Sequence, residues 1–165
     1  MRFNWVDLLS LGVVALVGAI QFLRGVKGLS IVFYETILVI AALVATASLF
    51  ERVSDAVGLA PVAAFAGMFV VLGVLGMVLA FLVNRFVAFD AGAFNYLFAL
   101  VLAVAFGWAV GHAVLRSLYI ALVPHDKEFL EAVHRSWMAS QLLRFGAFYE
   151  LLALLRFARY SNVAE

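Results

Sequence analysis

Residues 61–83 read PVAAFAGMFVVLGVLGMVLAFLV and contain no charged side chain. At about 1.5 Å per residue a helix of this length rises about 35 Å, slightly more than the ~30 Å hydrocarbon core of a bilayer. Lipid offers no hydrogen bonds to an open backbone, so such a segment has to be helical. Pro61 suits the first helical turn, where its missing amide would have no intrahelical partner. The segment therefore predicts a transmembrane helix.

Three further apolar segments of similar length surround it. They are residues 6–23, 29–50 and 94–115. The last of these either ends there or continues as far as Pro124, which cannot be accommodated inside a helix. The connectors, residues 24–28, 51–60 and 84–93, are short, so consecutive helices are expected to run antiparallel.

The composition agrees with a membrane protein. Of the 165 residues 67% are hydrophobic and 13% are charged, whereas soluble domains are about half apolar and a quarter charged. The net charge of +1 argues against nucleic acid as a partner, and the absence of cysteine excludes disulfides and thiolate metal sites. We predict one all-α integral membrane domain over residues 1–165, with four transmembrane helices and a C-terminal amphipathic helix, whose main partner is the lipid bilayer.

The start of the first segment carries helix-capping signals. Asn4 can accept hydrogen bonds from the first free amides, and Asp7 lies where the helix dipole favours an anion. A cleavable signal peptide is the alternative. Only Arg2 precedes the segment and no clear small-x-small cleavage site follows it, so we expect a span.

The polar tail, residues 126–160, predicts an amphipathic surface helix. Asp126 is a plausible cap, and the charges that follow it are spaced at i,i+4 on an exposed face. Residues 141–159 then separate into a basic side and an apolar side, the basic side being Gln141, Arg144, Arg156 and Arg159. A fifth span is the alternative, but each charge at mid-membrane costs about 3 kcal/mol.

The orientation in the membrane is left open by the charges that flank the four spans. Four basic residues belong to the side that holds the N-terminus and three to the other, a difference too small for the positive-inside rule to decide. The two sets are Arg2, Arg52, Arg116 and Lys127 against Arg24, Lys27 and Arg85.

Small residues repeat every four positions on some helices, where they allow close helix contact in lipid. Gly107 and Gly111 are the candidate packing positions in the fourth span, and they suit either self-association or, as we favour, packing within the bundle. In the first span Leu11, Ala15 and Ala19 share a face.

Two ionisable residues inside spans are functional candidates, Glu35 and His112. They would suit a proton-linked pathway. We favour a structural role for them, either as a polar pair that pins the bundle or as side chains that reach the membrane surface.

Signals of catalysis are absent from the sequence. The three histidines, at 112, 125 and 134, have no zinc-type spacing to one another or to a carboxylate. A glycine-rich phosphate loop and a nucleophile elbow are also absent. We expect no enzyme activity, no cofactor and no metal.

Three stretches resemble a known family. The chain begins with Trp5-Val6-Asp7, continues through an apolar span to Arg24-Gly25, and carries the run Ser136–Leu142 after the fourth span. In this order and spacing they resemble the colicin V production protein (CvpA) family, in which a Trp-Ile-Asp-type start precedes Arg-Gly and a Trp-x-x-Ser element follows four spans. The chain departs from that pattern after Lys27, where no acidic partner follows, and at 90–95, which keeps only Asp90.

The resemblance implies a multi-pass protein of the bacterial inner membrane, needed for colicin V production or export or for envelope homeostasis. Trp137 and Ser140 are then the candidate functional motif of the tail. We expect Trp137 at the membrane interface and Ser140 as the cap of a helix that begins at Gln141. The function classes are a scaffold or assembly factor, which we prefer, a small oligomeric channel or proton-coupled transporter, and an anchor subunit for a membrane protein partner.

Overall fold

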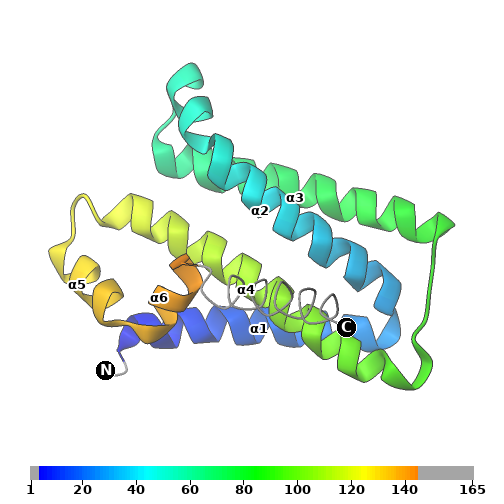
Figure 1. Cartoon of the computed structure of the whole chain (residues 1–165). Helices are drawn as coiled ribbons and strands as arrows, with labels where there is room; N and C mark the ends of the chain where they lie inside the picture. Colours follow the sequence, from blue (N-terminus) through cyan, green and yellow to red (C-terminus); the bar gives the residue numbers. More distant parts are fainter. Residues whose placement is uncertain (1–3, 145–165) are drawn as a thin grey trace, which may run out of the picture.

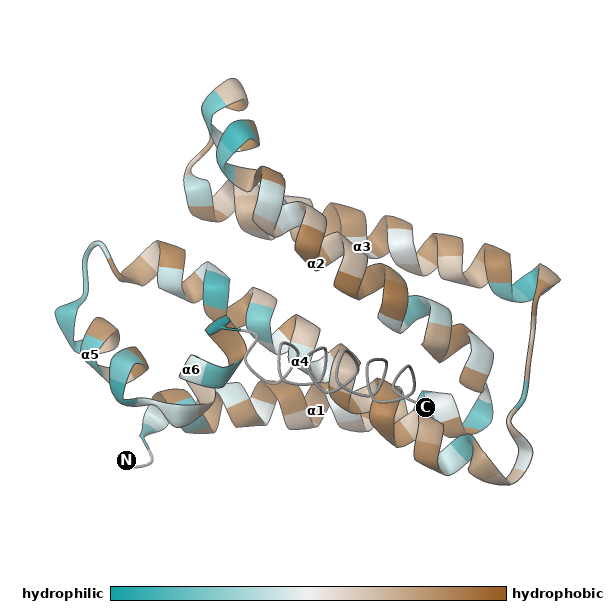
Figure 2. Cartoon of the chain, in the orientation of Figure 1, coloured by the Kyte–Doolittle hydropathy of each residue, from teal (hydrophilic) through white to brown (hydrophobic). Residues whose placement is uncertain are grey.

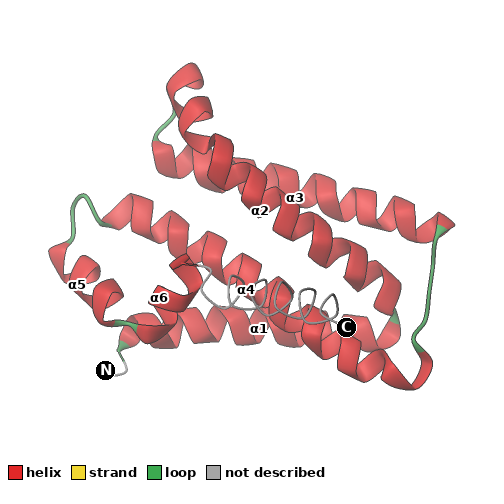
Figure 3. Ribbon diagram, in the orientation of Figure 1, coloured by secondary structure: helices red, strands yellow, loops and turns green. Residues whose placement is uncertain are grey.

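The computed structural model describes residues 4–144, which form six α-helices and one short 3-10 turn, with no strand in that range (Figures 1 and 3). The elements in chain order are α1 Trp5–Lys27, α2 Leu29–Val57, α3 Pro61–Phe86, η1 Gly92–Phe94, α4 Asn95–Leu122, α5 Lys127–Arg135 and α6 Trp137–Arg144.

Helices α1 to α4 are each long and apolar enough to cross a bilayer, which confirms the prediction of four spans. The chain is a multi-pass helical membrane protein. The residues of α3 and of the first half of α4 are mostly hydrophobic, whereas hydrophilic residues gather at the far end of α2 and on α5 and α6 (Figure 2). Large exposed apolar side chains along α3, such as Val70, Leu75 and Phe81, suit a lipid-facing surface.

The four spans pack as two antiparallel pairs, α1 with α4 and α2 with α3, and α2 also contacts α4 (Figure 1). A small buried cluster joins the second pair to α4, and it includes Val39 of α2, Phe65 of α3 and Phe106 of α4. Within it the rings of Phe50 and Phe65 meet edge-to-face, with their centroids 5.3 Å apart. The ends of α1 and α4 that lie beside the N-terminus also carry α5 and α6.

The helices are longer than the apolar segments, which corrects the expected connectors. Residues 24–27, 51–57 and 84–86 are helical, and only Gly28 separates α1 from α2. The fourth span follows the longer of its two predicted alternatives, since α4 continues to Leu122. Hydropathy marks where the chain leaves the hydrocarbon, but a helix can continue into the interface because its backbone bonds are internal. Pro124 follows the end of α4 at Leu122, as expected.

The loop before α4 is held by its own polar side chains. The Asp90 carboxylate accepts hydrogen bonds from the Gly92 amide at 2.6 Å and from Asn95 Nδ2 at 2.9 Å. The Asn95 and Gly92 bonds hold the pKa of Asp90 below its ordinary value. Gly92 has φ of 59°, a left-handed conformation that glycine adopts at little cost.

The described part of the tail consists of two short helices, α5 and α6, with a break at Ser136. We expected a helix to begin at Gln141, but α6 already begins at Trp137. Asp126 caps α5, since its carboxylate accepts the Phe129 amide at 2.9 Å. Arg156, Arg159 and the rest of the predicted amphipathic segment beyond Arg144 lie outside the described residues.

Candidate functional site

The first turn of α1 is closed by a reciprocal cap. The Asn4 side chain accepts the amides of Val6 and Asp7 at 2.8 and 3.2 Å, and the Asp7 carboxylate accepts the Asn4 amide at 2.9 Å. Such a capping box satisfies amides that a helix leaves free. Asp7 is thereby held in place at the start of the first span.

The same carboxylate also binds the tail. Asp7 Oδ1 accepts the Ser136 hydroxyl at 2.7 Å and the Met138 amide at 2.9 Å. Asp7 and Ser136 are each 2% exposed, so these bonds are shielded from water. A buried carboxylate is costly unless donors surround it, and here three donors do so. Asp7 therefore joins the N-terminus of α1 to the N-terminus of α6.

Ser136 is the residue that starts α6, because its hydroxyl oxygen accepts the Ala139 amide at 2.9 Å while its hydrogen goes to Asp7. The prediction that Ser140 caps this helix is wrong. Its hydroxyl lies inside α6 and donates back to the Trp137 carbonyl at 2.7 Å, a pattern that begins no helix. Trp137 itself is 54% exposed.

We call this contact region the tail junction. It consists of Asn4, Asp7, Ser136 and Met138 with the side chains packed around them, and one more hydrogen bond and a set of apolar contacts reinforce it. Asn4 Nδ2 donates to the Ala132 carbonyl at the end of α5 at 2.7 Å. Around it lies a buried cluster from α1, α4, α5 and α6: Val6, Leu115, Phe129, Val133, Met138, Ala139 and Leu142. The junction holds the helix pair against the membrane domain.

His112 belongs to the same region of the molecule. It is buried in α4, and its Nδ1 lies 2.6 Å from the carbonyl oxygen of Leu142 in α6, so the nitrogen is the donor. This hydrogen bond joins a buried side chain of α4 to the backbone of α6. Its described role is thus attachment of α6 to α4.

Glu35 has different partners, on α1. Its carboxylate accepts Arg24 Nη2 at 2.6 Å and Gln21 Nε2 at 2.8 Å, while Arg24 Nη1 donates to Gln21 at 2.9 Å. Glu35 is 4% exposed, so it does not reach the surface directly. The three side chains connect α1 and α2 across their one-residue turn. Glu35 and His112 are therefore not a polar pair with each other.

Gly107 and Gly111 lie in the seam between α1 and α4. A Cβ at Gly107 would come 2.6 Å from the Val14 carbonyl oxygen, and one at Gly111 would come 2.6 Å from Val14 Cγ2. From the other side Gly18 approaches the Ala103 carbonyl, so the two backbones touch at this level. Both glycines serve packing within the bundle.

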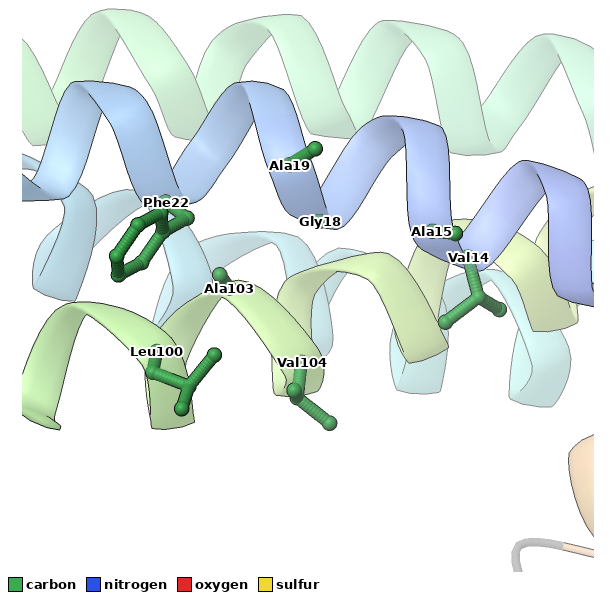
Figure 4. A pocket seen from close by; sticks show the side chains of 8 residues that line it. All are labelled: Val14, Ala15, Gly18, Ala19, Phe22, Leu100, Ala103 and Val104. Carbon is green, nitrogen blue, oxygen red and sulfur yellow. The ribbon is translucent and has the colours of Figure 1, made fainter.

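The seam leaves an apolar groove of about 260 Å³ on one side (Figure 4). Its lining is Val14, Ala15, Gly18, Ala19, Phe22, Leu100, Ala103 and Val104. The expected face of Leu11, Ala15 and Ala19 is therefore not the packing face: all three are exposed, and α1 buries Gly18, Gln21 and Gly25 instead.

Sequence reasoning missed the role of Asp7 and Ser136 in joining the ends of the chain. Both stand in stretches quoted for the family resemblance, and that was the available signal. As for metals, residues 4–144 bring together no group of three His, Asp or Glu side chains suited to an ion.

The fold and its junctions define a class: a four-span helical membrane protein whose tail helices dock on the first span. Comparison with protein-family models, curated proteins and solved structures finds no match to this chain.

Proposed function

We propose that the chain is an inner-membrane scaffold or assembly factor of the colicin V production type, acting in toxin export or envelope homeostasis in a bacterium. One observation carries the proposal. The stretches that resemble the family, Trp5-Val6-Asp7 and Ser136–Leu142, lie 129 residues apart and meet through the Asp7–Ser136 and Asp7–Met138 bonds. Motifs that share one contact are more specific together than each is alone.

The tail junction suits a docking platform. It fixes α5 and α6 at one end of the bundle, with Trp137 half exposed on a helix that packs against α1, α4 and α5. An exposed aromatic ring on such a support is typical of the residues that anchor protein contacts. A scaffold needs only such a surface, with no chemistry of its own.

The charges support a cytoplasmic location for this platform. The basic residues of the described chain at the platform end are Arg52, Arg116, Lys127, Arg135 and Arg144, against Arg24, Lys27 and Arg85 at the other end. Arg24 is in addition paired with Glu35. By the positive-inside rule the platform end faces the cytoplasm, with both ends of the described chain on that side.

A small oligomeric channel or proton-coupled transporter is the alternative, and buried Glu35 is the observation that favours it. An intramembrane carboxylate is a default candidate for ion or proton handling. Its ion pair with Arg24 at 2.6 Å gives Glu35 a structural role between α1 and α2, and that is why we place the scaffold first.

The test is Trp137→Ala in a cell whose colicin V export depends on this protein. We expect normal membrane insertion, reduced export and loss of a partner that co-purifies with the wild type in mild detergent. Phe86→Ala is the matched control, because Phe86 is also an exposed aromatic but lies at the other end of the bundle. Equal export from wild type and Trp137→Ala would refute the platform, and proton flux from the purified protein in liposomes would favour the transporter.

A further inference from the structure

A second feature of the platform end is a pocket of about 250 Å³ between α4, α5 and α6, lined by both polar and apolar residues. Arg116 and Tyr119 line it from α4, His134 from α5 and Arg144 from α6. Val133 and Leu143 form its apolar wall. A space of this size holds several water-sized groups, so it is larger than a single ion requires.

The described residues that line this pocket carry charge of one sign. They include two arginines and a histidine, and none of those within 4–144 is a carboxylate. Within residues 4–144 the arginines that form ion pairs are Arg24, with Glu35, and Arg135, with Glu131. Arg116 and Arg144 are thus two guanidinium groups beside one cavity without an acidic partner in the described chain, and that favours an anion.

The donors fit a phosphate group in particular. Guanidinium forks match phosphate oxygens with two parallel hydrogen bonds, and Tyr119, which also lines the pocket, carries a hydroxyl that can donate to an anion. Ser140 also lines the pocket, but its hydrogen is already given to the Trp137 carbonyl. The anion would therefore be bound mainly by Arg116, Arg144 and Tyr119.

The depth of the pocket matches a lipid headgroup. Arg116 comes 21 residues after Asn95, the start of α4, so it lies about 32 Å along a helix that crosses a ~30 Å hydrocarbon core. Trp5 and Trp137 begin α1 and α6, which pack together at this end, and both are about half exposed, as is typical of tryptophans at a membrane interface.

We propose that this pocket binds the phosphate of an anionic phospholipid headgroup and so fastens α5 and α6 to α4 at the membrane surface. The proposal does not depend on the family resemblance. Each arginine near a headgroup contributes about 1 kcal/mol, so removing one is expected to weaken binding about fivefold.

The experiment uses the full chain in detergent and native mass spectrometry, with phosphatidylglycerol, phosphatidylcholine and inorganic phosphate as separate probes. We expect a retained phosphatidylglycerol, little phosphatidylcholine, and about fivefold weaker binding in Arg116→Gln and in Arg144→Gln. Arg135→Gln is the matched control, since it removes the same charge from an exposed site outside the pocket. Helix content by circular dichroism shows that each variant is folded, and the two pocket variants lie on different helices, so either one suffices.

An equal loss of phosphatidylglycerol binding in all three variants would overturn the proposal, because the lipid would then be held by diffuse surface charge and not by the pocket. Equal retention of phosphatidylcholine would also overturn it. If millimolar inorganic phosphate displaces the lipid and raises the melting temperature by itself, the phosphate chemistry is supported and the lipid is overturned as its source.

Discussion

The sharpest prediction concerns Asp7→Asn, which keeps the shape of the side chain and removes its charge. Asp7 accepts three hydrogen bonds, from Ser136 and Met138 at Oδ1 and from Asn4 at Oδ2. The amide of asparagine has one acceptor atom and one donor atom, so at least one of these donors would face an NH₂ group.

The magnitude follows from the bonds that are lost. A hydrogen bond to a charged group contributes about 1.5–3 kcal/mol, and a buried donor left unpaired costs a similar amount. We therefore expect Asp7→Asn to weaken docking of α5 and α6 by roughly 2–3 kcal/mol, about 30- to 150-fold in the docking equilibrium. The four spans are expected to remain inserted, because the lost contacts lie at one end of the bundle.

Hydrogen exchange of the full protein in detergent measures this directly. The amides of Met138 and Ala139 should exchange faster in Asp7→Asn, since Asp7 and Ser136 are their acceptors. Asp55→Asn is the control, because Asp55 is an exposed carboxylate near the end of α2. Unchanged exchange at 136–144 in Asp7→Asn would refute the tail junction as the element that holds α6.

Three further predictions concern the membrane domain. Gly107→Ala should destabilise the detergent-solubilised protein by about 1–3 kcal/mol, because the added Cβ meets the α1 backbone. Gly67→Ala is the control and should not destabilise it, because Gly67 faces open space. Equal melting temperatures for the two variants would refute the close contact of α1 with α4 at Gly107. Glu35→Gln should cost roughly 1–2 kcal/mol, since Arg24 is half exposed and can turn to water, while Glu51→Gln on the exposed end of α2 should be neutral in the same melting assay. Reporter fusions at 58–60 and after 126 should lie on one side and those at 28 and 87–91 on the other; any other pattern contradicts four spans.

Local signals in the sequence determined the class of the protein and the number of spans. Apolar runs of 18 or more residues have one solution in lipid, so the four helices followed from hydropathy alone. The caps at Asn4 and Asp126 were also predictable, because a cap bonds to amides two or three residues away. The ends of the helices were not, since a helix does not stop where its hydropathy falls.

Only the tertiary structure decided what the polar residues do. Ser136, and not Ser140, caps α6, because the fold brings Asp7, 129 residues earlier in the chain, to where it accepts the hydroxyl hydrogen of Ser136. Which face of α1 is buried depended on where the α4 glycines approach it, and small residues occur on both faces. Glu35 is a paired charge because a one-residue turn returns α2 to Arg24. Hydropathy and capping act over a few residues, but each of these roles depends on groups that only packing brings together.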